Sequence, residues 1–234
     1  VNAARKLKGE SPFILSRAES YIGTLIDDLV TKGTNEPYRI MTSRSEYRLV
    51  LRQDNADLRL MKRGYDIGLV PEERLRAVEE KYAAVEREIK RLEHTGVAPS
   101  PALTEFLTAH GTADAPDGCS LLALLKRPQL HYAELAPFDP DRPPLPADVA
   151  EEIEISVKYE GYIKRQLQQV AEFKRVEGHK LPPDMDYNSI QGLRLEAREK
   201  LSAVRPMDLG QASRISGVSP ADVTALMIWL ENNR

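Results

Sequence analysis

Arginine side chains recur every four to seven residues between positions 39 and 63, among tyrosines and aliphatic residues. This stretch carries seven basic and three acidic side chains, and arginine outnumbers lysine. A planar guanidinium can bind phosphate oxygens and stack on rings, and tyrosines such as Tyr38 and Tyr47 offer a flat face to an unstacked base. The pattern is typical of a polyanion-binding surface, and its candidate residues are Arg39, Arg44, Arg48, Arg52 and Arg59.

The same composition also suits structural ion pairs at a domain junction, with the nearby carboxylates Glu46, Asp54 and Asp57 holding the arginines. A second basic group favours the polyanion surface. Residues 158–180 hold six basic and three acidic side chains, whereas residues 134–154 hold seven acidic and one basic. The candidates in this second group, interleaved with Tyr159 and Tyr162, are Lys158, Lys164, Arg165, Lys174 and Arg175.

Other residues give little support for catalysis within this chain. The segment RGYDIG at 63–68 contains glycines but lacks the strand, turn and helix that cradle a nucleotide phosphate. The histidines His94, His110, His131 and His179 have no second ligand at helical spacing, so a metal site is not expected. Cys119 has no cationic neighbour in the sequence and is expected to be a small buried side chain. We therefore predict no catalytic residue and no metal ligand here.

Composition bounds the class of protein. The chain has 234 residues, enough for one large domain or two to three small ones, and a formal net charge of -3. Any basic surface must therefore be local. One cysteine cannot form an intramolecular disulfide, and no apolar run approaches the roughly 20 residues of a membrane span. These features predict a cytoplasmic protein with no membrane partner.

The periodicity predicts a mainly α-helical chain. Apolar spacing indicates helices over residues 12–31, 54–68, 71–92 and 147–176, separated by a loop-rich connector between 97 and 146. Alternation of Tyr47, Leu49 and Leu51 with charged or smaller residues predicts a small β element near residues 38–52. The last fifty residues predict a C-terminal bundle of short helices.

Two similar segments in that bundle begin at Ile190 and Ile215, and each reads as a tight glycine turn into a helix. Ser219 followed by Pro220 is a typical start for the second helix. The turns at Gly192 and Gly217 could bind phosphate, the apolar residues could face a protein partner, or the bundle could be self-contained.

Three blocks carry a family resemblance: residues 16–60, YEGYIKRQ at 159–166, and residues 181–223. They resemble the C-terminal portion of the glucose-inhibited division protein A family, the tRNA uridine 5-carboxymethylaminomethyl modification enzymes. Between about 70 and 145 only helix-forming character agrees. Ser45 and Arg194 stand where the family commonly has alanine and serine.

The resemblance implies part of an FAD-dependent flavoprotein that modifies the wobble uridine of tRNA together with a tRNA-modifying GTPase, using NADH and a methylene-folate carbon donor. In that family the flavin fold and the cysteines linked to catalysis lie upstream of the matched region. The fragment alone is therefore expected not to be catalytic. The full-length enzyme is expected to be a homodimer.

The resemblance also implies an organisation along the chain. Residues 1–68 would border the flavin domain, residues 69–158 would form a helical middle domain, and residues 159–234 would bind tRNA and the partner. The rival hypothesis is a helical interaction scaffold with no RNA affinity. The residues that match the family's terminal module, and are expected to dock the GTPase, are Leu209, Gln211, Arg214, Ile215, Gly217 and Val218.

Overall fold

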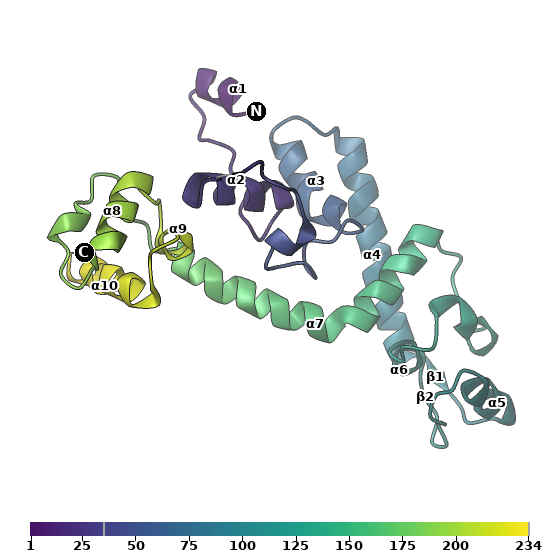
Figure 1. Cartoon of the computed structure of the whole chain (residues 1–234). Helices are drawn as coiled ribbons and strands as arrows, with labels where there is room; N and C mark the ends of the chain where they lie inside the picture. Colours follow the sequence, from purple (N-terminus) through teal and green to yellow (C-terminus); the bar gives the residue numbers. More distant parts are fainter. Residues whose placement is uncertain (35, 234) are drawn as a thin grey trace. The chain divides into compact units, whose positions relative to one another are not determined.

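The computed structural model describes residues 1–34 and 36–233, and it confirms the mainly α-helical class (Figure 1). The long helices are α4 (Glu72–His94) and α7 (Ala147–Glu177). The other elements are α1 (Asn2–Leu7), α2 (Tyr21–Thr31), η1 (Thr42–Arg44), α3 (Ala56–Asp66), β1 (Gly96–Val97), α5 (Pro101–Ala109), β2 (Cys119–Ser120), α6 (Leu121–Leu125), η2 (Tyr132–Phe138), η3 (Tyr187–Ser189), α8 (Leu195–Val204), α9 (Leu209–Arg214) and α10 (Pro220–Asn232).

The predicted position of the β element was wrong. Residues 42–44 form the short helix η1, and residues 47–51 form one helical turn, in which the Leu51 N–H donates to the Tyr47 carbonyl at 2.8 Å. Tyr47 and Leu51 are both buried, and a spacing of four places them on one side of that turn. Over only five residues, inward positions at 47 and 51 fit the alternation of a strand as well as one turn of a helix. The two-stranded sheet instead pairs Gly96 with Ser120 in antiparallel register.

Packing divides the chain into two compact units. One unit joins residues 1–51 to residues 165–234, and the other consists of residues 52–164. Helix α7 contributes its first part to the second unit and its last part to the first. This division differs from the linear one expected from the sequence, because residues 1–51 pack with the C-terminal part of the chain.

The unit of residues 52–164 has an aliphatic core built largely from the connector that the sequence marks as loop-rich. Leu103, Leu107 and Leu124 from that connector pack with Leu92 of α4 and Ile153 of α7. A polar cluster closes one edge of this core: the Arg91 guanidinium bridges Glu88 and Asp139, and the Tyr132 hydroxyl donates to Glu88 at 2.8 Å. Both carboxylates are buried, so these partners offset the cost of their desolvation.

The C-terminal bundle follows the expected local chemistry. The Ser219 hydroxyl accepts from the Asp222 N–H and Asp222 reaches back to the Ser219 N–H, which forms a capping box at the start of α10. Gly192 and Gly217 both have positive φ angles, +87° and +97°, so each makes the predicted tight turn before a helix. Leucine side chains from every helix of the bundle fill its core: Leu201, Leu209 and Leu226 are fully buried.

Helix α2 is shorter than predicted and faces the other way. It begins at Tyr21, because the Ser20 hydroxyl caps the Gly23 N–H at 2.9 Å. Three apolar side chains expected to point inward are exposed: Ile22 by 58%, Ile26 by 55% and Leu29 by 42%. The buried face is polar, and it is organised around the guanidinium of Arg17.

Candidate nucleic-acid interface

The arginines of the 39–63 stretch divide into structural and exposed groups. Arg52 forms ion pairs with Asp54 at 2.9 Å and Glu152 at 3.5 Å. Arg59 donates to the Asn55 side chain and to the Arg52 carbonyl, both at 2.9 Å. These two half-buried guanidinium groups brace the unit of residues 52–164, as the structural alternative predicts for them.

Arg39, Arg44 and Arg48 behave differently and are exposed. The Arg44 guanidinium lies over the Tyr38 ring, 5.1 Å from its centroid, and the Tyr38 hydroxyl donates to Asp28 at 2.8 Å. Among the residues that the structure describes, no side-chain partner is found for the guanidinium of Arg39 or Arg48. These side chains are accessible to a ligand from solvent.

Helix α7 carries most of the second basic group on its exposed surface. Lys158 pairs with Glu154 at 2.9 Å and is half-buried, whereas Lys164, Arg165, Lys174 and Arg175 are exposed. At about 100° per residue, Arg175 lies on the side of α7 opposite Gln166. Arg165, Lys174 and Arg175 belong to the unit that also contains Arg48, and Lys164 ends the other unit.

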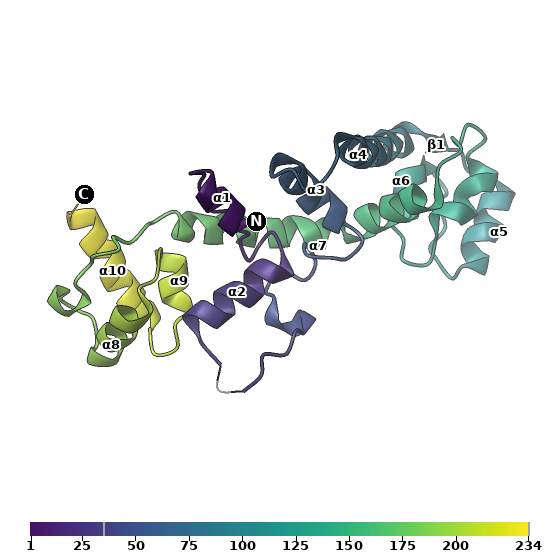
Figure 2. The same cartoon turned by 90° about the horizontal axis from the view of Figure 1, so that it is seen from above.

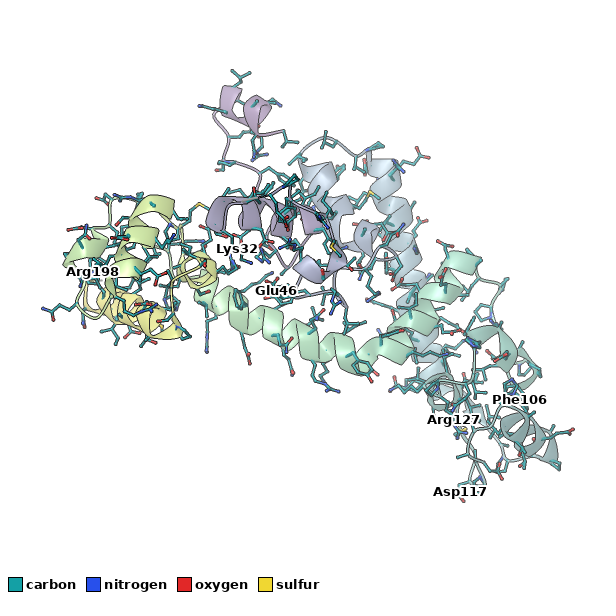
Figure 3. All side chains as sticks on the ribbon, viewed as in Figure 1. Lys32, Glu46, Phe106, Asp117, Arg127 and Arg198 are labelled. Carbon is teal, nitrogen blue, oxygen red and sulfur yellow. The ribbon has the colours of Figure 1, made fainter. Side chains whose placement is uncertain are left out.

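A side-chain amide holds the Arg48 segment on α7. The Gln166 Oε1 atom accepts hydrogen bonds from the Leu49 and Val50 N–H groups, both at 2.9 Å. Its Nε2 atom donates to the carbonyl of Glu46 at 3.2 Å, a residue labelled in Figure 3. Tyr47 and Leu51 pack on Val170, one turn further along α7. The backbone on both sides of Arg48 is therefore fixed against the same helix as Arg165 and Arg175.

Buried arginines neutralise the carboxylates of this unit. Arg17 is only 4% exposed and pairs with Asp27, Asp28 and Glu46 at 3.2, 2.7 and 2.7 Å. Burial by itself would raise the pKa of Asp28. Hydrogen bonds from Tyr38, Arg17 and Lys32 outweigh burial and lower that pKa below its usual value.

A second buried arginine completes the same network. Arg214 of α9 pairs with Asp27 of α2 at 2.7 Å and with Glu177, the last residue of α7, at 3.1 Å. Figure 2 shows α9 lying against α2. These acidic groups are paired with internal arginines. They therefore do not neutralise the exposed cations of the unit. Exposed cations thus coexist with the negative net charge of the chain.

The residues expected to dock a partner lie mostly inside the bundle. Leu209 and Ile215 are buried, Val218 packs against the same core, and Gly217 makes the turn before α10. Gln211 donates to Asp27 at 3.4 Å, beside the Arg214 pair. These residues build the bundle and attach it to α2. The large apolar side chains that the bundle exposes are Leu195, Met207, Met227 and Ile228.

Little else in the described residues suggests bound cofactors. Within residues 1–34 and 36–233, no group of three or more His, Cys, Asp or Glu side chains could hold a metal ion. Burial raises the pKa of the Cys119 thiol. In the described residues, neither two-residue strand runs into a glycine-rich turn that opens a helix. In the same residues, no helix is both long and apolar enough to span a membrane.

Sequence reasoning missed the roles of Gln166, Arg17 and Arg214. Gln166 lies 117 residues from Leu49, and Arg214 lies 187 residues from Asp27. The sequence did contain a signal for Gln166, because it is a polar residue on an apolar stripe of the helix. A polar side chain in such a position needs a hydrogen-bonding partner when it is covered.

By its architecture the chain is a mainly helical region of two units. Two family models match it: the tRNA modifying enzyme MnmG/GidA C-terminal helical domain over residues 72–167, and the MnmG/GidA C-terminal helical bundle over residues 169–234. The chain belongs to the MnmG/GidA family and corresponds to its C-terminal helical region.

Individual relatives give the same result. The tRNA uridine 5-carboxymethylaminomethyl modification enzyme MnmG of Caldicellulosiruptor saccharolyticus is 58% identical over 99% of this chain and 37% of that protein. The enzyme of the same name from Bacillus subtilis is 52% identical over 100% of this chain and 37% of that protein. The form II crystal structure of Aquifex aeolicus GidA matches with a TM-score of 0.83 at 41% identity, covering 98% of this chain and 36% of that one. The chain thus spans little more than a third of these relatives.

Proposed function

We propose that this chain is the tRNA-binding and partner-docking region of an FAD-dependent enzyme that forms 5-carboxymethylaminomethyluridine at the wobble position of tRNA. FAD, NADH and the methylene-folate donor would be bound by other parts of a cytoplasmic, homodimeric enzyme. The contribution of this chain is binding and orientation of the tRNA. Chemistry at the uridine ring would take place outside it, so no reaction step is assigned to its residues.

One observation carries the tRNA part of this proposal: Arg48, Lys174 and Arg175 are exposed cations of a single unit, in which Asp27, Asp28, Glu46 and Glu177 are already paired with Arg17 or Arg214. When exposed cations contact a phosphate backbone, counterions held by that backbone are released, and this release drives binding. Arg165 is a further exposed cation of the same unit on α7. Arg39, Arg44 and Lys164 are further exposed candidates, and Arg52, Arg59 and Lys158 support the fold.

Replacing Arg48 in the full-length protein tests the site. We expect Arg48→Ala to weaken binding of unmodified tRNA by roughly tenfold, because one charge-assisted phosphate contact is lost. The slope of log affinity against log salt should fall by about 0.7 to 0.9. Filter binding across a salt series measures both quantities.

The matched control is Lys90→Ala, which removes an exposed cation from α4. It should leave affinity and slope close to those of the wild type. Equal effects of the two substitutions would remove the argument for a localised site. A protein that binds no tRNA, or binds it without a salt slope, would support the rival scaffold hypothesis.

We also infer that residues 1–68 form the border with the flavin domain. The support is the exposed apolar face of α2, made by Ile22, Ile26 and Val30, together with Leu58 and Tyr65 exposed on α3. Exposed apolar side chains clustered on one helix, as on α2, are typical of a segment that another domain covers. Most of the length of the relatives lies outside the matched region, which leaves ample chain to provide that cover.

We propose that the exposed apolar side chains of α10 contact the GTPase. The buried residues around Leu209 would hold α10 in place. We expect the double substitution Met227→Asp with Ile228→Asp to weaken GTPase capture by about tenfold or more, because central apolar anchors dominate such interfaces. Surface plasmon resonance with the full-length protein measures this. Ala203→Asp, at an exposed position of α8, is the control. Undiminished capture by the double variant would exclude α10 as the contact.

A further inference from the structure

The segment that presents Arg48 is an isolated helical turn whose first N–H groups need acceptors from outside the turn. Residues 47–51 make a single turn, closed by the Leu51 N–H donating to the Tyr47 carbonyl at 2.8 Å. The first N–H groups of any helical turn lack partners within it. Here the Ser45 hydroxyl accepts from the Tyr47 N–H at 3.1 Å, and Gln166 accepts from the N–H groups of Leu49 and Val50. The Val50 N–H also donates to the Tyr47 carbonyl at 3.0 Å.

Gln166 therefore acts as a cap supplied from a distant helix. A single turn is far too short to be stable alone, so its geometry depends on such outside partners. The third bond, from Gln166 Nε2 to the Glu46 carbonyl, fixes the amide orientation, because a flipped amide would face this carbonyl with an oxygen. The Glu46 side chain is in turn held by Arg17 at 2.7 Å. Both sides of Arg48 are thus pinned, while its own side chain faces solvent.

We propose that Gln166 is a positioning residue that holds the 47–51 turn on α7 and so fixes the backbone that presents Arg48 on a phosphate-binding surface. This inference rests on the proposed function. Gln166 does not touch RNA. It fixes the backbone that carries the contacting arginine, and the surface therefore needs a neutral amide at this point, which can both accept and donate.

The structural half of the proposal can be measured without RNA. In the full-length protein, Gln166→Leu should speed hydrogen–deuterium exchange of the Leu49 amide by about tenfold or more, because it loses its acceptor on α7. The Val50 N–H also donates to the Tyr47 carbonyl at 3.0 Å, so its exchange should change less. Gln166→Glu keeps that acceptor and should retain slow exchange there. Exchange across the bundle core, residues 181–230, should stay unchanged and report that each variant is folded. Unchanged exchange at 47–51 in the leucine variant would overturn the proposal.

The functional half uses a double-mutant cycle. We expect Gln166→Leu to weaken tRNA binding about fivefold and to lower the salt slope by about 0.7 to 0.9, as loss of one phosphate contact does. On an Arg48→Ala background the same substitution should have little further effect on either quantity. Gln169→Leu, at an exposed neighbouring position, is the control and should match the wild type.

The outcomes separate this inference from the proposed function. Wild-type tRNA affinity in Arg48→Ala would contradict the proposed function, and the inference with it. A clear loss in Arg48→Ala, combined with equal losses from Gln166→Leu on both backgrounds, would overturn the positioning role alone. A change in affinity without a change in salt slope would do the same, since it would indicate a general loss of stability.

Discussion

Arg17→Ala is expected to lower the free energy of unfolding of its unit by about 4 kcal/mol, because removing one partner of a buried ion pair leaves uncompensated buried charge. The Arg17 guanidinium donates to the Thr24 carbonyl and pairs with Asp27, Asp28 and Glu46. Asp28 is itself buried. The substitution would leave that carboxylate with Tyr38 and Lys32 as its remaining partners.

Denaturant unfolding, followed by hydrogen exchange of residues 21–31, measures the loss. Arg17→Lys should recover little, because an ammonium cannot reproduce the planar fork that reaches several acceptors at once. Arg39→Ala removes an exposed arginine from the same unit and should change stability by less than about 0.5 kcal/mol. An Arg17→Ala variant as stable as Arg39→Ala would show that the buried carboxylates do not depend on this residue.

Features of the fold that depend on neighbouring residues were predictable from the sequence. Pro71 with Glu72 and Glu73 marks the start of α4, and Ser219 with Pro220 marks the start of α10. These signals work because a helix N-terminus is satisfied by side chains within a few residues. The glycine turn at Gly217 follows the same logic, since its backbone conformation is a local requirement.

Features that depend on distant partners were not predictable. The apolar stripe of α2 suggests an inward face, yet Arg17 and Asp28 organise the opposite, polar face of the helix as the buried one. The pattern of arginines in 39–63 left two roles open, structural ion pairing and phosphate binding. Only the tertiary structure separates Arg52, which reaches Glu152 at a distance of 100 residues, from the exposed Arg48.

Asp222→Asn is expected to destabilise the C-terminal bundle by about 3 kcal/mol near neutral pH, because a buried carboxylate with several charge-assisted bonds is lost. Asp222 is fully buried and accepts from Arg194 Nη2 at 2.7 Å, from the Ser219 hydroxyl at 2.6 Å and from the Ser219 N–H at 2.8 Å. An asparagine offers one oxygen in place of two, and its NH₂ group would face the guanidinium.

The same contacts predict a pH dependence. The hydrogen bond from Arg194, helped by those from Ser219 and opposed by burial, holds the pKa of Asp222 far below its usual value. A carboxyl whose pKa is lower in the folded state contributes its full stability above the unfolded pKa, about 3.9 for aspartate. That contribution is lost as the pH falls below about 4 toward the folded pKa.

Unfolding free energies of the wild-type protein should therefore fall steeply below about pH 4, and those of Asp222→Asn should fall less over the same range. Asp28 also has a lowered pKa and contributes to the slope in both proteins, so the difference between them isolates Asp222. Asp184→Asn, at an exposed position of the same bundle, should keep the wild-type slope. If Asp222→Asn keeps it too, the depressed pKa is not what makes the bundle acid-sensitive, and Arg194 and Ser219 hold this helix start by geometry alone.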